Sequence, residues 1–343
     1  MTRGPSGGSA GSGAAPIRIA SRGSELALWQ ARAVEAAVRA ADPSAAVEIA
    51  VVKTTGDRIT DVPLAKIGDK GLFTKEIDAA LLAGEADLAV HSLKDVPTRV
   101  PDGLEIAAIG RREDPRDVLI LPPGQTGSLA ALPPGARVGT SSLRRRAQLR
   151  ALRPDLEVLD LRGNLNTRLA KLDRGDYDAI VLAAAGVLRL GWADRIAAYL
   201  DPAEWLPAVG QGALGVVCRA GDERVRGLLG GFHDPFTSAC TAAERAFLAA
   251  LEGGCQIPIG ALAHADEDGL TLHGLVADVE GESVLRDSEC LPFEAESGSG
   301  AVSPEDAAAL GRRLAARLVE MGADRILARV RGMAPVVPEP AAP

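Results

Sequence analysis

Residues 137–152 read RVGTSSLRRRAQLRAL: a short apolar run, a turn with two serines, and a stretch with helical character. We expect a strand at 137–139 and a helix at 143–152. The turn between them combines Ser141 and Ser142 with the free backbone N–H groups of a helix start. A strand that leads through a polar turn into a helix is typical of α/β folds, which bind ligands at the carboxyl ends of their strands.

The same alternation continues on both sides of this stretch. Toward the N-terminus it predicts strands at 17–20, 47–53 and 87–90, with helices at 24–41 and 74–82, and a long charged loop at 57–71. Toward the C-terminus it predicts strands at 118–121, 157–160 and 179–182, with helices at 164–173 and 183–191. Alternation of this kind predicts two α/β units with mainly parallel sheets.

The pattern changes after about Gly231. A helix is expected at 237–252, followed by β-rich runs at 257–264, 270–278 and 283–290. A last helix begins at Ser303-Pro304-Glu305-Asp306, an N-cap, a proline and two acids, and is expected to end near Met321. Strands in series followed by one helix predict a small α+β domain with an antiparallel sheet.

The composition of the 343-residue chain argues against several classes of protein. A net charge of −8 and an aromatic content of 3% disfavour a nucleic-acid binder, which needs positive charge and stacking side chains. No apolar run is long enough for a membrane span, and the Gly/Ser/Ala-rich start lacks the apolar core of a signal peptide. Four scattered cysteines and four scattered histidines predict reduced thiols and no metal site.

Cationic and hydroxyl side chains gather at the predicted strand ends of this acidic protein. Those of the second unit are Ser142, Arg144, Arg145, Arg162 and Arg168, and those of the first are Arg22, Ser24, Lys66, Lys70 and Lys94. We expect the two groups to face one crevice and to bind a ligand with several carboxylates. An ordinary basic helix surface stays open as the alternative for residues 144–146.

Two further residues have a chemical and a plain interpretation. Asp95, among these cations, either balances charge or protonates a leaving amine and stabilises a cationic intermediate. Cys255 lies in EGGCQIPIG, residues 252–260, where glycines and a proline indicate a loop. Its thiol is a nucleophile, an attachment point or an inert buried group.

Eight segments in order resemble the porphobilinogen deaminase (hydroxymethylbilane synthase) family. They are RGSELALWQ at 22–30, PLAKIGDKGLF at 63–73, HSLKDVP at 91–97, REDPRD at 112–117, GTSSLRR at 139–145, LRGN at 161–164, PAVGQG at 207–212 and EGGCQIPIG at 252–260. The resemblance runs from about residue 17 to 331. Asp69, a negative charge between Lys66 and Lys70, departs from the family pattern.

The resemblance implies two type II periplasmic-binding-protein-like domains around a cleft and a smaller α+β C-terminal domain. Domain 1 would span 17–110 and 212–230, domain 2 would span 111–211, and domain 3 would span 231–331. The ends, 1–16 and 332–343, are expected to be disordered.

The resemblance also implies roles for single residues. Cys255 would hold a dipyrromethane cofactor through a thioether, and Asp95 would be the catalytic carboxylate. Lys94, Ser142, Arg144, Arg145, Arg162 and Arg168 would bind cofactor carboxylates. Arg22 and Ser24, with Lys66 and Lys70 from a mobile loop, would bind the substrate. The implied enzyme is a cytoplasmic monomer that joins four porphobilinogen molecules with loss of ammonia.

Two rival functions come from other classes. A non-catalytic solute-binding protein shares the architecture of the first two domains. An RNA-binding module using the arginines of 144–153 is the second, and the acidity of the chain opposes it.

Overall fold

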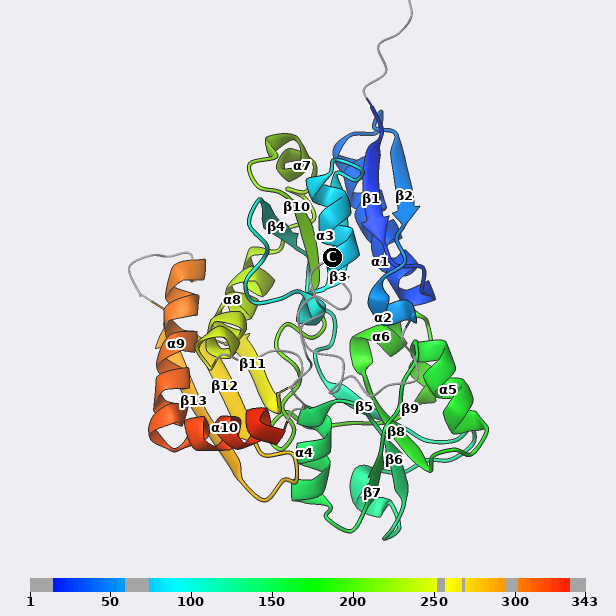
Figure 1. Ribbon diagram of the computed structural model, residues 1–343, viewed down its shortest axis with the longest axis vertical. Helices are drawn as coiled ribbons and strands as arrows, with labels where there is room; N and C mark the ends of the chain where they lie inside the picture. Colours follow the sequence, from blue (N-terminus) through cyan, green and yellow to red (C-terminus); the bar gives the residue numbers. More distant parts are fainter. Residues whose placement is uncertain (1–14, 59–73, 252–256, 267–268, 294–301, 334–343) are drawn as a thin grey trace, which may run out of the picture.

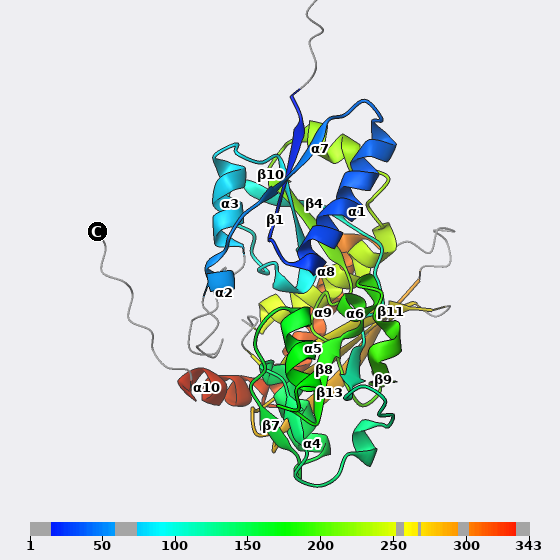
Figure 2. The same ribbon diagram turned by 90° about the vertical axis from the view of Figure 1, so that its right-hand side faces the viewer.

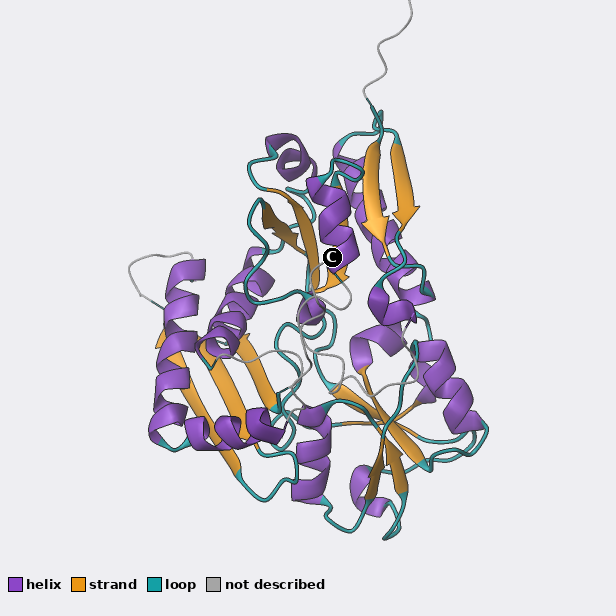
Figure 3. Ribbon diagram, viewed as in Figure 1, coloured by secondary structure: helices purple, strands orange, loops and turns teal. Residues whose placement is uncertain are grey.

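The computed structural model describes residues 15–58, 74–251, 257–266, 269–293 and 302–333. Their strands form three sheets, two of five strands and one of three. Figures 1 and 3 show the first sheet at the top of the molecule, the second at the lower right and the third at the lower left. The view in Figure 2 shows the first two sheets one above the other.

The first sheet has the strand order β2-β1-β3-β10-β4. Its strands are β1 (Ile17–Ser21), β2 (Val47–Val51), β3 (Leu88–Ser92), β4 (Leu104–Ile109) and β10 (Leu214–Arg219). The accompanying helices are α1 (Glu25–Ala41), α2 (Thr55–Arg58), α3 (Lys75–Leu82) and α7 (Glu223–Leu228). Strands β1, β2 and β3 are parallel, as predicted, whereas β10 runs antiparallel between β3 and β4.

The second sheet repeats this order as β7-β6-β8-β5-β9, with β5 antiparallel between β8 and β9. Its strands are β5 (Asp117–Ile120), β6 (Arg137–Gly139), β7 (Glu157–Leu159), β8 (Ala179–Ala183) and β9 (Ile196–Tyr199). Its helices are α4 (Leu143–Leu152), α5 (Leu165–Asp173) and α6 (Ala184–Arg189). Two equivalent sheets, each with one reversed strand, confirm the predicted pair of type II periplasmic-binding-protein-like domains.

The chain crosses between the two sheets twice. Residues 110–116 lead from β4 to β5, and residues 200–213 lead from β9 back to β10. Each crossing delivers a strand that enters the next sheet from its carboxyl edge, which explains why β5 and β10 are reversed. The sequence pattern predicted neither reversal, and it also missed the strands β4, β9 and β10 and the helix α7.

The third sheet is the predicted antiparallel one, formed by β11 (Ile259–Ala265), β12 (Gly269–Ala277) and β13 (Val284–Pro292). The helices α8 (Pro235–Ala250) and α9 (Pro304–Glu320) pack against it through a buried core that includes Phe247, Leu310 and Leu314. A further helix, α10 (Ala323–Met333), follows Gly322, whose φ of +102° interrupts the helical path. The expectation of a single last helix is therefore wrong.

We propose domain boundaries close to those expected, at 110/111, 211/212 and 230/231, because each sheet and its helices fall within them. The ends, 1–14 and 334–343, lie outside the described residues. Among the helices that the structure describes, none is long and apolar enough to cross a membrane.

A buried ion pair joins the third domain to both crossing segments. The carboxylate of Glu244, on α8, is fully buried and accepts hydrogen bonds from Arg112 at 2.6 and 3.1 Å. It also accepts from the backbone N–H groups of Gly210, at 2.7 Å, and Ala263, at 2.8 Å. Because one carboxylate receives donors from three parts of the chain, it fixes the crossing segments against the third domain.

We expect Glu244→Gln to destabilise the fold by about 3 kcal/mol, because it leaves the Arg112 guanidinium largely buried without a counter-charge. The urea midpoint of unfolding measures this loss. Glu35→Gln is the matched control, since the Glu35–Arg39 pair lies on the surface of α1 and contributes about 0.5 kcal/mol or less. Equal midpoints for the two variants would contradict the prediction.

Candidate active site

A cavity of about 1970 Å³ lies between the first two domains and reaches the third at Leu248 and Ile257. Its lining includes every predicted site residue that the structure describes, namely Arg22, Ser24, Lys94, Asp95, Ser142, Arg144, Arg145, Arg162 and Arg168. The predicted Lys66, Lys70 and Cys255 lie outside the described residues. Residues 120 or more positions apart in sequence therefore share one cavity, as expected.

Three helices begin at the cavity wall. Ser24 caps α1, Ser142 caps α4 and Asn164 caps α5, and each side-chain oxygen accepts from a backbone N–H three residues on. All three caps line the cavity. Helix N-termini carry partial positive charge and free N–H groups, so they favour anions in the space that they face.

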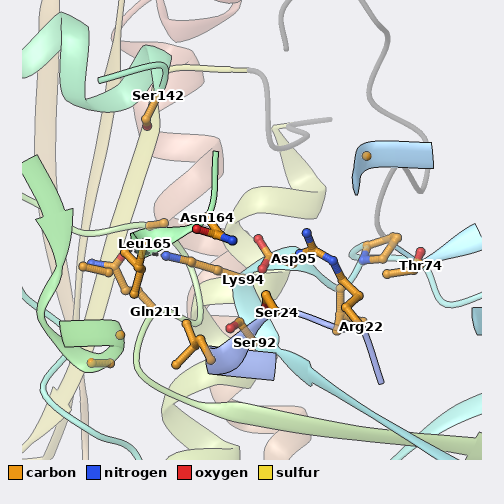
Figure 4. Close-up of a pocket in the computed structure, with 18 of the residues that line it drawn as sticks. Arg22, Ser24, Thr74, Ser92, Lys94, Asp95, Ser142, Asn164, Leu165 and Gln211 are labelled. Atoms are coloured by element: carbon orange, nitrogen blue, oxygen red, sulfur yellow. Dashed lines mark hydrogen bonds between the residues drawn. The ribbon is translucent and has the colours of Figure 1, made fainter. Parts of the chain in front are cut away.

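Lys94 and Asp95 project from the short turn that ends β3, at the centre of the site between Arg22 and the domain 2 residues (Figure 4). The Lys94 Nζ donates to Gln211 Oε1 at 3.3 Å. Although part of this side chain faces the cavity, burial of the ammonium lowers the pKa of Lys94 to about 8, with Asp95 opposing that shift. Asp95 is partly exposed at the cavity wall.

Arg144 and Arg145 share one buried carboxylate, that of Asp117 at the start of β5. Arg144 Nη1 donates to Asp117 Oδ2 at 2.8 Å, and Arg145 Nη2 donates to Oδ1 at 2.7 Å. Burial alone would raise the pKa of Asp117, but the two guanidinium groups hold it well below its usual range. Because two guanidinium groups share one carboxylate, the cluster has a net positive charge at the cavity.

Each of these two buried guanidinium groups has donors that the described residues do not use. Arg144 uses two donors, on Asp117 and the Leu206 carbonyl, and Arg145 uses two, on Asp117 and the Val181 carbonyl. Each arginine carries five N–H donors, so three on each are unused by the described residues. Arg145 Nε is buried without such a partner, which marks a donor that needs an acceptor.

Arg162 and Arg168 complete the cationic wall in domain 2. Arg168 Nε donates to the Gly163 carbonyl at 2.8 Å. Burial, with Arg145 nearby, lowers the pKa of Arg168 to about 10, and burial also lowers the pKa of Arg162. Both side chains remain cationic at neutral pH, because a guanidinium group stays protonated in proteins.

Family models match most of the chain. The model described as "Porphobilinogen deaminase, dipyromethane cofactor binding domain" matches residues 17–227, and "Porphobilinogen deaminase, C-terminal domain" matches 238–320. The chain belongs to the porphobilinogen deaminase family.

Curated relatives support this membership. The porphobilinogen deaminase of Syntrophobacter fumaroxidans is 54% identical over 92% of this chain and 97% of its own length. That of Moorella thermoacetica is 54% identical over 92% of this chain and 96% of its own. Among solved structures, the periplasmic VFT2 domain of Bordetella pertussis BvgS is 17% identical, with 62% of this chain and 84% of that chain covered and a TM-score of 0.38.

The sequence did not predict three site residues of this porphobilinogen deaminase family member. Asp117 is described above, and Gln211 lies in the second crossing segment and contacts both Asp117 and Lys94. Arg189, at the end of α6, lines the cavity, lies over the Trp29 ring at 5.5 Å and donates to the Gly212 carbonyl at 2.6 Å. Burial lowers the pKa of Arg189 to about 10. Its place near the end of the helix predicted at 183–191, which follows the strand predicted at 179–182, was the available signal.

The described residues of this family member contain no cluster of three or more His, Cys, Asp and Glu side chains with metal-binding geometry. The described lining of the cavity instead presents guanidinium and ammonium groups, capped helix starts and the carboxylates of Asp78, Asp95 and Asp102, of which Asp95 lies beside Lys94. That arrangement suits a ligand with several carboxylates and a reaction that develops positive charge near Asp95.

Proposed function

We propose that this chain is a porphobilinogen deaminase, that is, a hydroxymethylbilane synthase. It joins four porphobilinogen molecules head to tail with loss of ammonia, on a covalently held dipyrromethane, and then releases the linear tetrapyrrole by hydrolysis. The observation that carries the proposal is the cation-lined interdomain cavity with the Asp95 carboxylate beside Lys94 at its centre, in a chain that belongs to this family.

The residues of the cavity fit a dipyrromethane cofactor. Each pyrrole unit derived from porphobilinogen carries an acetate and a propionate, so two linked units carry several carboxylates. The unused donors of Arg144 and Arg145, the buried Arg145 Nε and the cations of Arg162 and Arg168 supply partners for such groups. When bound, the cofactor supplies the pyrrole carbon to which successive units are added.

We assign roles to residues by combining the resemblance with the cavity lining. Cys255 is the attachment point, and Ile257, two residues further on, lines the cavity. The cofactor carboxylates bind to Lys94, Ser142, Arg144, Arg145, Arg162 and Arg168. The substrate carboxylates bind to Arg22 and Ser24, and also to Lys66 and Lys70, which rest on the resemblance alone.

Asp95 transfers the proton and stabilises the positive charge of each addition. Its carboxylic acid gives a proton to the substrate amine as the carbon–nitrogen bond breaks and ammonia leaves. The resulting carboxylate faces the positive charge that develops on the pyrrole, and later takes up the ring proton that is lost after carbon–carbon bond formation. Lys94, held by Gln211 beside it, binds a carboxylate and keeps this charge balanced. From the resemblance alone, the enzyme is proposed to be a monomer in the cytoplasm.

Incubation of the purified protein with porphobilinogen tests the proposal. We expect release of ammonia together with a linear tetrapyrrole, in a ratio of four to one set by the proposed stoichiometry. Binding of porphobilinogen without ammonia release would favour a solute-binding protein instead, and neither binding nor turnover would overturn both functions.

A further inference from the structure

The carboxylate of Asp117 is saturated by four donors. Oδ1 accepts from Arg145 Nη2 at 2.7 Å and Gln211 Nε2 at 2.8 Å, and Oδ2 accepts from Arg144 Nη1 and Trp205 Nε1, both at 2.8 Å. The side chain is fully buried. A buried carboxylate remains ionised only when such partners compensate its burial. Because the four donors occupy the lone pairs of both oxygens, Asp117 has none left to accept from a ligand.

The reversal of β5 places this carboxylate next to the site. Asp117 pairs with Ala183, the last residue of the antiparallel neighbour β8. The first residue of β5 therefore lies at the carboxyl edge of the sheet, where the cavity opens. A strand parallel to β8 would have put the same residue at the opposite edge.

Gln211 extends the influence of Asp117 to the other domain. Its Nε2 donates to the Pro115 carbonyl at 2.8 Å as well as to Asp117, which leaves Oε1 to accept from Lys94 Nζ. The orientation of the amide is thus determined by acceptors around its nitrogen. One chain of contacts runs from β5 in domain 2, through the crossing segment, to the residue beside Asp95.

We propose that Asp117 is the positioning residue of the cavity, fixing the guanidinium groups of Arg144 and Arg145 directly and the ammonium of Lys94 through Gln211. This role rests on the proposed function and adds to it a residue that touches neither substrate nor cofactor. Flexible cations lose conformational freedom when they bind carboxylates. Asp117 removes most of that cost in advance, so its effect is on binding more than on the chemical step.

The main test is Asp117→Asn, which keeps the shape of the side chain but removes its charge and places an amide beside the guanidinium groups. We expect the concentration of preformed tetrapyrrole that loads half of the cofactor-free protein to rise at least tenfold, and kcat of the loaded enzyme to change several times less. Asp178→Asn is the matched control, because Asp178 also pairs with an arginine, Arg137 at 2.9 Å, but at the opposite edge of the same sheet. We expect this loading concentration for the control to stay within about twofold of wild type.

A second variant, Gln211→Met, removes the acceptor of Lys94 together with the amide donor to Asp117 and the Pro115 carbonyl. The readout is the acetylation rate of Lys94, measured by peptide mass spectrometry at pH 8 after treatment with acetic anhydride. Asp95 and Asp117 favour the charged form of Lys94, whereas Arg144 and Arg145 favour the neutral form. Loss of the Gln211 acceptor, or of the Asp117 charge, raises the neutral amine fraction, so we expect acetylation at least threefold faster in both variants.

The results of these experiments distinguish a positioning role of Asp117 from a purely structural one. A lowered urea midpoint in Asp117→Asn with an unchanged loading concentration, or unchanged Lys94 acetylation in Gln211→Met, would overturn the positioning role. If Asp117→Asn does not fold, the Lys94 acetylation rate in Gln211→Met decides alone. Absence of porphobilinogen turnover in the wild-type protein would instead contradict the proposed function. The acetylation experiment would still report on Asp117 and Gln211.

Discussion

Asp95→Asn should fold, keep a cofactor supplied as preformed tetrapyrrole, and lose turnover by a factor on the order of 10²–10⁴, the usual contribution of a positioned acid–base group. The substrate is anionic, so a carboxylate in its site weakens ground-state binding. Loss of ammonia and attack by a pyrrole carbon both develop positive charge. An interaction that is stronger in the transition state than in the ground state lowers the barrier selectively, and we therefore expect the loss in kcat.

The structure makes this variant conservative for the fold. Asp95 ends a short turn held by backbone contacts, Leu93 N to the Ala213 carbonyl at 3.0 Å and Val96 N to the Leu93 carbonyl at 3.1 Å. Its side chain is partly exposed to the cavity, so an amide there needs no new buried partner. Unfolding should therefore not account for the loss, and circular dichroism checks this.

Two comparison variants sharpen the experiment. Asp95→Glu keeps the charge and should keep part of the activity. Asp102→Asn changes another carboxylate of the cavity lining, one that is almost fully exposed and bears no proposed role, and should turn over within about twofold of wild type. Normal turnover in Asp95→Asn, or a defect confined to KM, would defeat the catalytic assignment.

Cys255→Ala should abolish both cofactor attachment and activity. Wild-type protein should have an intact mass greater than that of the chain by two linked pyrrole units, and the variant should have the mass of the bare chain. Because every addition is proposed to take place on the attached cofactor, loss of the thioether leaves no acceptor for the first unit, and turnover should fall to background.

The other three thiols are poor candidates for attachment. Cys218 in β10 and Cys240 in α8 are buried, and burial raises their pKa values to about 11 and about 12, so both stay neutral and unreactive. Cys290 is exposed on β13. Cys290→Ala is the control and should keep the added mass. Retention of that mass by Cys255→Ala would show that another residue holds the cofactor.

The sequence predicted most elements because their signals are local. The helix at 143–152 was placed to the residue, since Ser142 caps it and a strand and turn precede it. β1, β6 and β8 are short apolar runs flanked by polar turns, and they were found within one or two residues. The missed α10 has equally local character, but it begins after Gly322, beyond the expected end of the last helix near Met321.

The candidate site was predictable where residues follow strands. Lys94, Ser142 and Arg162 come directly after runs that become parallel strands, and the carboxyl ends of such strands meet at one edge. Their convergence on one cavity followed from that rule. The roles of Lys66, Lys70 and Cys255 stay predictions, because these residues lie outside the described part of the chain.

The sequence by itself determined the two repeated α/β units, the small third domain and the cationic character of the cleft, because periodicity, capping and charge are properties of neighbouring residues. Only the tertiary structure decided that Asp117 belongs to the site. A residue that begins a strand is expected at the amino edge of a sheet, far from a ligand. The chain enters the second sheet from the cleft side, so β5 is reversed and Asp117 lies beneath Arg144 and Arg145, with Gln211 from the second crossing closing the network. Direction of entry depends on the path between domains, and no local pattern encodes it.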